Sequence, residues 1–155
     1  MQPYKDQYTP SPFDPATLME RMKDGVAVLD HDWRFLYLNE TGARIVGQPK
    51  ADLLGKVIWE VYPADVGTVC AAKYRAARDT QQPVTFEEYH PPFDVWFAIT
   101  VYPSDSAVTI YFEDVTARKA AAAASERRFR ALIEQSADTC ILLNAAGSSS
   151  TLASP

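Results

Sequence analysis

The sequence predicts an α+β domain built on a five-stranded antiparallel sheet with short helices over one face. Two short apolar runs come first, helical segments follow, and three longer runs after position 83 alternate with a period of two. The turns between these runs are short and no strand–helix–strand unit recurs, which argues against a parallel sheet. A chain of 155 residues, 47% of them hydrophobic, supports one core of about 100 residues plus linkers.

Residues 1–14 are polar and proline-rich and are expected to form a flexible lead-in. A helix is predicted from Pro15 to Lys23, because an aspartate precedes it and proline is favoured at the first helical position. Val26–Asp30 and Trp33–Leu38 then form a predicted β-hairpin around a polar turn. Asn39 is a candidate N-cap for the next short helix.

A longer helix is predicted from Asp65 to Thr80, where apolar positions, Val66 and Val69 among them, keep a spacing of three to four residues. Three strands follow, rich in β-branched and aromatic residues. They are predicted at Val84–Tyr89, Val95–Tyr102 and Val108–Glu113. Together with the first hairpin they complete the sheet.

From Ala117 the chain is expected to be helical again, since it holds five consecutive alanines and several charged residues. Residues 120–137 are assigned to a linker helix. Val115, Ala122, Phe129 and Ser136 are seven residues apart, which hints at a coiled coil. A single amphipathic helix lying on the domain explains the same pattern equally well.

Residues 132–144 are similar to residues 18–30. Leu, Glu, Asp and Leu recur at matching positions, and most other pairs keep their polarity. We interpret residues 138–147 as the start of a second, truncated repeat and residues 148–155 as a disordered tail of low complexity. The chain is therefore expected to be a piece of a tandem array, with chance similarity as the alternative.

Composition argues against several classes of function. The net charge is −5, with 20 acidic and 15 basic residues, which does not favour nucleic acids or anionic membranes as partners. No apolar run approaches the roughly 20 residues of a membrane span, and the start does not resemble a signal peptide. Cys70 and Cys140 match no metal-binding spacing, so a reducing, cytoplasmic setting is expected.

Four segments, taken in order, resemble the PAS sensor domain. They are Asp24–Asp30, Phe35–Asn39, Leu54–Pro63 and the closing Tyr111–Lys119, which contains Asp-Val-Thr. We assign residues 15–119 to this domain with its N-terminal helix. The resemblance implies a sensory and dimerisation module of a cytoplasmic signalling protein, such as a bacterial two-component histidine kinase. No kinase or other catalytic motif appears in the chain, so it is not itself expected to be an enzyme.

Asp114 and Thr116 are the candidate signal-transmitting residues. Thr116 can cap the helix that begins near Ala117, and Asp114 can pair with a cation or accept backbone hydrogen bonds at the same joint. The resemblance implies that this strand–helix joint passes a signal onward. A plain helix start is the alternative, and both interpretations can hold together.

Apolar and aromatic residues are candidates to line a pocket between the sheet and the helices. They are Val46, Leu54, Trp59, Tyr62, Cys70, Tyr74, Phe86, Trp96 and Ile110. Plain core packing explains the same residues and is the stronger alternative.

Two cofactors and an enzymatic site are not expected. Haem-binding relatives carry a histidine on the long helix, which residues 65–80 lack, and both His31 and His90 are expected at the surface. The surroundings of Cys70 do not match the motif of LOV flavin domains. Glu87 and Glu88 are adjacent on a strand and face opposite sides, so they cannot share a substrate. Neither a catalytic nor a metal site is predicted.

The expected partners are a second copy of the chain and, as a further candidate, a small-molecule ligand. Homodimerisation is predicted through the N-terminal helix and the C-terminal helix, because each carries an apolar stripe. A ligand-free protein–protein interaction scaffold is the alternative function.

Overall fold

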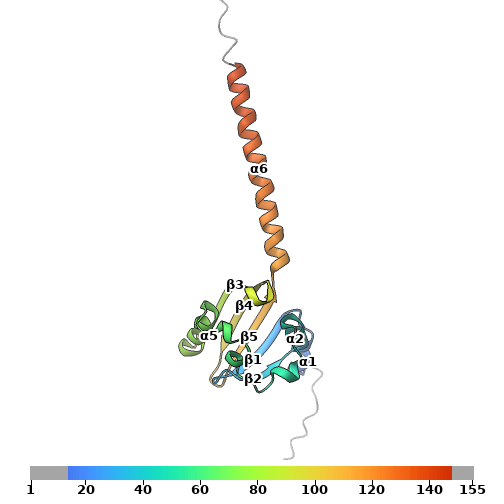
Figure 1. Ribbon diagram of the computed structural model, residues 1–155, viewed down its shortest axis with the longest axis vertical. Coiled ribbons are helices and arrows are strands. Elements are labelled where there is room, and N and C mark those ends of the chain that lie inside the picture. The colour runs from blue at the N-terminus through green and yellow to red at the C-terminus, as the bar shows by residue number, and fades with distance from the viewer. Residues whose placement is uncertain (1–13, 148–155) are drawn as a thin grey trace, which may run out of the picture. The chain divides into compact units, whose positions relative to one another are not determined.

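The computed structural model describes residues 14–147 and divides the chain into two units that meet between Val115 and Thr116 (Figure 1). The first unit holds a five-stranded antiparallel sheet in the order β2-β1-β5-β4-β3, which confirms the predicted α+β class. The strands are β1 (Gly25–Asp30), β2 (Phe35–Leu38), β3 (Val84–His90), β4 (Val95–Pro103) and β5 (Ala107–Asp114). Apart from Asp14, the predicted lead-in lies outside the described residues, as does the predicted tail at 148–155.

Short helices connect the strands of the first unit. They are α1 (Pro15–Glu20), α2 (Glu40–Val46), α3 (Lys50–Leu53), α4 (Ile58–Val61), the 3-10 turn η1 (Pro63–Asp65), α5 (Val69–Thr80) and the 3-10 turn η2 (Pro91–Phe93). Helix α5 packs on β3 and β4, and α2 packs on β1. Side chains alternate along β4 and β5, so that one face of these strands is buried in the core.

The last strand lies in the middle of the sheet. β5 pairs with β1 from Gly25 opposite Phe112 to Asp30 opposite Ala107. Its other edge pairs with β4, where Phe97 is opposite Asp114. The two ends of the domain are therefore joined by backbone hydrogen bonds.

Helix α5 begins later than the sequence predicts. Gly67 has a φ of 90°, a left-handed conformation that interrupts a helix, and the predicted start at Asp65 belongs to η1 instead. Thr68 is the N-cap of α5, and its side chain accepts a hydrogen bond from the backbone N–H of Ala71. Val66 and Val69, predicted on the buried face, are 52% and 62% exposed.

The second unit contains one helix, α6 (Thr116–Gly147). The stretch predicted to enter a second repeat as a strand, within residues 138–147, is helical and continues α6. A lone strand leaves its backbone donors and acceptors unpaired, whereas a helix satisfies them within the segment.

Val115 precedes the helix and is buried in the core of the first unit at 1% exposure, so it is not part of a helical seam. Within residues 14–147, the structure contains no helix with both the length and the apolar character needed to cross a membrane.

Asn39 joins four parts of the fold through its buried side chain, which is 0% exposed. Its Oδ1 accepts hydrogen bonds from the backbone N–H groups of Val26 (2.9 Å) and Gly42 (2.8 Å). Its Nδ2 donates to the carbonyls of Met19 (2.8 Å) and Asp24 (3.0 Å). The amide thus caps α2, as predicted, and also connects the end of β2 with α1 and β1.

We expect Asn39→Ala to lower the free energy of unfolding by about 3 kcal/mol, because it leaves buried backbone donors and acceptors without partners. Urea denaturation monitored by circular dichroism measures this loss. Asn39→Asp should also destabilise, since a carboxylate cannot donate to the two carbonyls. Gln82→Ala, at an exposed position between α5 and β3, is the control and should change little. An Asn39→Ala protein as stable as that control would contradict the assigned role.

Candidate functional site

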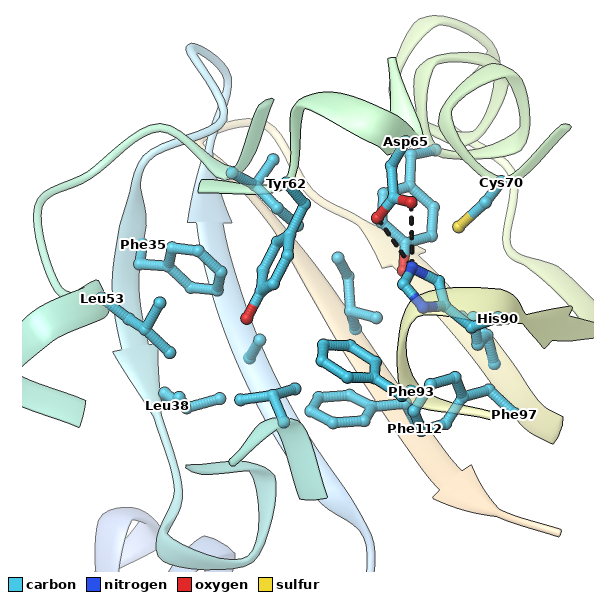
Figure 2. Close-up of a pocket in the computed structure, with 16 residues that line it drawn as sticks. Phe35, Leu38, Leu53, Tyr62, Asp65, Cys70, His90, Phe93, Phe97 and Phe112 are labelled. Atoms are coloured by element: carbon cyan, nitrogen blue, oxygen red, sulfur yellow. Dashed lines mark hydrogen bonds and ion pairs between the residues drawn. The ribbon is translucent and has the colours of Figure 1, made fainter. Parts of the chain in front are cut away.

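A cavity of about 90 Å³ lies between the inner face of the sheet and the segments that run from α2 to α5 (Figure 2). Its walls are mostly aliphatic and aromatic. The lining residues are Ala27, Phe35, Leu38, Val46, Leu53, Ile58, Tyr62, Asp65, Cys70, Tyr74, His90, Phe93, Phe97, Ile99, Ile110 and Phe112. β1, β2, β4 and β5 contribute the apolar side chains of the sheet side.

One hydrogen-bonded pair of polar side chains, His90 and Asp65, lines this cavity. Nε2 of His90 lies 2.9 Å and 3.1 Å from the two carboxylate oxygens of Asp65, as the dashed lines of Figure 2 show. Both side chains are largely buried, at 17% and 20% exposure. His90 was predicted at the surface and is not there, because it falls on the inward-facing positions of β3 together with Phe86 and Glu88. The pair connects the end of β3 with η1.

Aromatic rings form a continuous chain along one side of the cavity. The His90 ring stacks on Phe93 with centroids 4.8 Å apart, and Tyr62 meets Phe93 edge-on at 6.0 Å. Phe93 in turn contacts Phe97, and Phe97 contacts Phe112 on β5 at 6.1 Å. Each ring therefore restricts the movement of the next one, from Phe93 on η2 to Phe112 on β5.

Two polar atoms on lining residues are buried and have no hydrogen-bond partner from the described part of the protein: Tyr62 Oη and His90 Nδ1. Burial raises the pKa of the Tyr62 hydroxyl to about 12, and the negative charge of Asp65 contributes to the rise. Figure 2 shows this hydroxyl directed toward the interior of the cavity. Two further buried atoms, Trp59 Nε1 and Glu88 Oε2, are unpartnered but belong to residues outside the lining.

Cys70 lines the cavity as a free thiol. Burial raises the pKa of this thiol to about 12, although a hydrogen bond with Tyr74 opposes part of the rise. The thiol form therefore predominates at neutral pH, and the side chain is a small, weakly polar part of the wall. Among the described residues, no group of three or more His, Cys, Asp or Glu side chains is arranged to hold a metal ion.

The nine residues predicted for the pocket divide into two groups. Val46, Tyr62, Cys70, Tyr74 and Ile110 line the cavity, whereas Leu54, Trp59, Phe86 and Trp96 do not. Leu54 is 44% exposed, and its neighbour Leu53 lines the cavity instead. Trp59 and Phe86 each contact the Tyr74 ring from positions outside the lining.

Trp96 lies on the other face of β4, where its ring contacts that of exposed Tyr89. Successive strand residues point to opposite faces, so Phe97 lines the cavity in its place. Sequence reasoning missed His90 and Asp65 as a pair. The alternation of side chains along β3 could have placed His90 on the inner face. His90 lies four positions after the core residue Phe86, and an even spacing puts both side chains on the same face of a strand.

The predicted joint lies where the two units meet. Asp114 is the last residue of β5 and is exposed, whereas Thr116 is the first residue of α6. The helix thus begins one residue earlier than predicted, and Thr116 is inside it rather than its N-cap. Between them, Val115 is buried and its N–H donates to the carbonyl of Trp96 at 2.8 Å. This bond holds the end of β5 to β4.

Comparisons with known proteins agree with this architecture. A family profile described as PAS fold matches residues 19–120. A domain of an HTR-like protein from Haloarcula marismortui is 16% identical with a TM-score of 0.53, and the match covers 61% of this chain and all of that one. A sensory box sensor histidine kinase from Vibrio cholerae is 18% identical with a TM-score of 0.53 over 66% of this chain and 90% of that one.

The PAS domain of nitrogen regulation protein NR(II) from Vibrio parahaemolyticus is 12% identical with a TM-score of 0.54 over 64% of this chain and 96% of that one. At these identities the structures are evidence of the fold alone. No curated protein matches the sequence.

We expect iodoacetamide to label Cys70 much more slowly in the folded protein than in the denatured one at pH 8. A rise in its pKa from 9.0 to about 12 lowers the thiolate population roughly a thousandfold, and only the thiolate reacts. Peptide mass spectrometry separates Cys70 from Cys140, and Cys70→Ser identifies the signal. Equal labelling rates with and without denaturant would contradict this description of the wall.

The same burial affects stability at high pH. Above pH 9 the thiol ionises in the unfolded chain but stays neutral in the folded one, so stability is lost as the pH rises toward 12. Cys70→Ala should reduce this alkaline loss of stability. Below pH 8 the variant and the wild type should show the same dependence of stability on pH.

Proposed function

This chain belongs to the PAS fold family, and from that premise we propose that it is a sensory and dimerisation module of a larger signalling protein. In this proposal the cavity holds a small ligand, and the Asp114–Thr116 joint passes the structural change caused by ligand binding to α6. The neighbours from sensor proteins support a histidine kinase as the whole protein, and the repeat at 132–144 supports a tandem array. The free thiol of Cys70 supports a cytoplasmic setting.

The observation that carries the proposal is the double role of β5. Ile110 and Phe112 line the cavity from this strand. Two residues after Phe112 the strand ends at Asp114, and α6 begins at Thr116. A ligand that shifts Phe112 therefore acts on the same short stretch of backbone that leads into the helix.

Phe112 is restrained by neighbours that link it to the rest of the cavity. Its ring contacts Phe97, which belongs to the aromatic chain that includes Phe93 and Tyr62. Across the β1–β5 pair, Gly25 is opposite Phe112, and a Cβ atom at Gly25 would clash with that ring. The ring rests directly on the backbone of β1, so it cannot move without its neighbours moving too.

The proposed mechanism is a shift between two arrangements of the aromatic chain. A ligand shifts this equilibrium only to the extent that it binds one arrangement more tightly than the other. The buried Val115 and its hydrogen bond to Trp96 then determine how a displacement of β5 reaches the first turn of α6.

We expect Asp114→Ala to speed hydrogen exchange of the amides in the first turn of α6 by roughly two- to fivefold. A carboxylate just before a helix N-terminus stabilises that terminus electrostatically, and its removal weakens the first turn. Hydrogen exchange with mass spectrometry measures the effect in the full chain. Asp105→Ala, which removes an exposed carboxylate from the β4–β5 turn, is the matched control. Identical exchange rates in Asp114→Ala and wild type would contradict the proposed role of the Asp114–Thr116 joint.

The alternative function, a ligand-free dimerisation scaffold, is favoured by one feature of α6. Phe129, Leu132 and Ile133 are exposed by 65%, 62% and 53%. Their spacing places them on one side of the helix. Such a stripe gains free energy when a second helix covers it. Leu18 on α1 is exposed by 53% and is the apolar residue by which that helix could join the interface.

We expect the chain to be a dimer at tens of micromolar, and Leu132→Glu to shift it toward monomer, because a charge in a buried seam is costly. Light scattering after size-exclusion chromatography gives the mass of each species. Ala131→Glu adds the same charge to the opposite side of the exposed helix and should leave the dimer intact. A monomeric wild type, or equal loss in both variants, would contradict dimerisation through this stripe.

A further inference from the structure

The geometry points to a small, neutral, single-ring aromatic molecule with one hydroxyl group as the ligand class of the cavity, recognised by Tyr62 and His90. This inference rests on the proposed sensory function and specifies the chemistry of its ligand. It is carried by four properties of the cavity: its size, its charge balance, its aromatic walls and its two unpartnered polar atoms.

Size limits the ligand first. An apolar cavity of roughly 150 Å³ takes up benzene, so a smaller cavity of about 90 Å³ sets one six-membered ring as the upper limit on ligand size. The surrounding rings of Phe93, Phe97 and Phe112 contact each other edge-on, which is the arrangement that a further aromatic ring joins favourably.

The charges of the cavity exclude an anion. No lysine or arginine belongs to the lining, and the one lining carboxylate, Asp65, is bonded through both oxygens to His90. A carboxylate or phosphate placed here would be buried without a counter-ion, which costs several kcal/mol by general estimates for buried ions. A cation would have to compete with His90 for Asp65. A neutral molecule meets neither cost.

The unpartnered atoms specify the polar group. Nε2 of His90 faces the Asp65 carboxylate and donates to it, so the unpartnered Nδ1 is an acceptor or, where it also holds a proton, a donor. The Tyr62 hydroxyl can donate or accept. A ligand hydroxyl is able to do both as well, so it can satisfy either atom, whereas a plain hydrocarbon satisfies neither. Leaving such buried groups unpaired is unfavourable, which is the source of the expected selectivity.

The test titrates the full 155-residue chain with four probes of one ring each: phenol, toluene, benzoate and anisole. We expect phenol to bind about fivefold to tenfold more tightly than toluene, which lacks the hydrogen bond, and benzoate not to bind. Toluene is the more apolar molecule, so a purely hydrophobic cavity would reverse this order. Isothermal titration calorimetry measures the binding of each probe. Anisole, which accepts but cannot donate, should bind more weakly than phenol.

Tyr62→Phe keeps the ring and removes the hydroxyl. It should weaken phenol binding about fivefold and leave toluene binding unchanged, whereas Tyr102→Phe, on an exposed side chain outside the cavity, should change neither. The probe series in the wild-type chain tests the proposal without this variant, in case Tyr62→Phe does not fold.

The outcomes separate the two levels of the proposal. Toluene binding as tightly as phenol, or benzoate binding best, overturns the ligand class and leaves the sensory function standing. Failure of all probes, together with no small molecule in native mass spectra of the purified chain, overturns both and supports the scaffold.

Discussion

The four hydrogen bonds of the Asn39 side chain determine how the first third of the domain is assembled. One planar amide connects the carbonyls of Met19 and Asp24 with the amides of Val26 and Gly42. It thereby determines where β1 begins, and with it the position of Gly25 beneath the Phe112 ring and of Ala27 on the wall of the cavity. The amide oxygen accepts two hydrogen bonds and the amide nitrogen donates two, so no other side chain of similar size can replace it.

The fold could be predicted from the sequence because its signals are local. Strand periodicity and the N-cap at Asn39 each depend on a few neighbouring residues, and the structure agrees with them. The start of α5 was missed because helical spacing continues through Gly67, whose left-handed backbone is not encoded in that spacing. The strand predicted beyond residue 138 is helical because a strand needs pairing partners, which local pattern does not supply.

The candidate site was harder to predict because it depends on contacts between distant residues. Asp65 and His90 are 25 positions apart, and two prolines after the histidine indicated an exposed turn. Trp96 was assigned to the wrong face by a one-residue error in parity, which reverses every side chain of a strand. Aromatic residues were correctly expected near the core, but pattern alone could not separate those that fill it from those that border a cavity.

The central position of β5 has a consequence for how the domain folds during synthesis. Without this strand, β2 with β1 and β3 with β4 are two separate hairpins that share no backbone hydrogen bond. The strand that unites them is the last to leave the ribosome, and its pairing of Gly25 with Phe112 closes a loop of most of the domain. Pairing across so long a loop is slow because of its entropic cost. The nascent domain therefore remains two unjoined hairpins until β5 has left the ribosome.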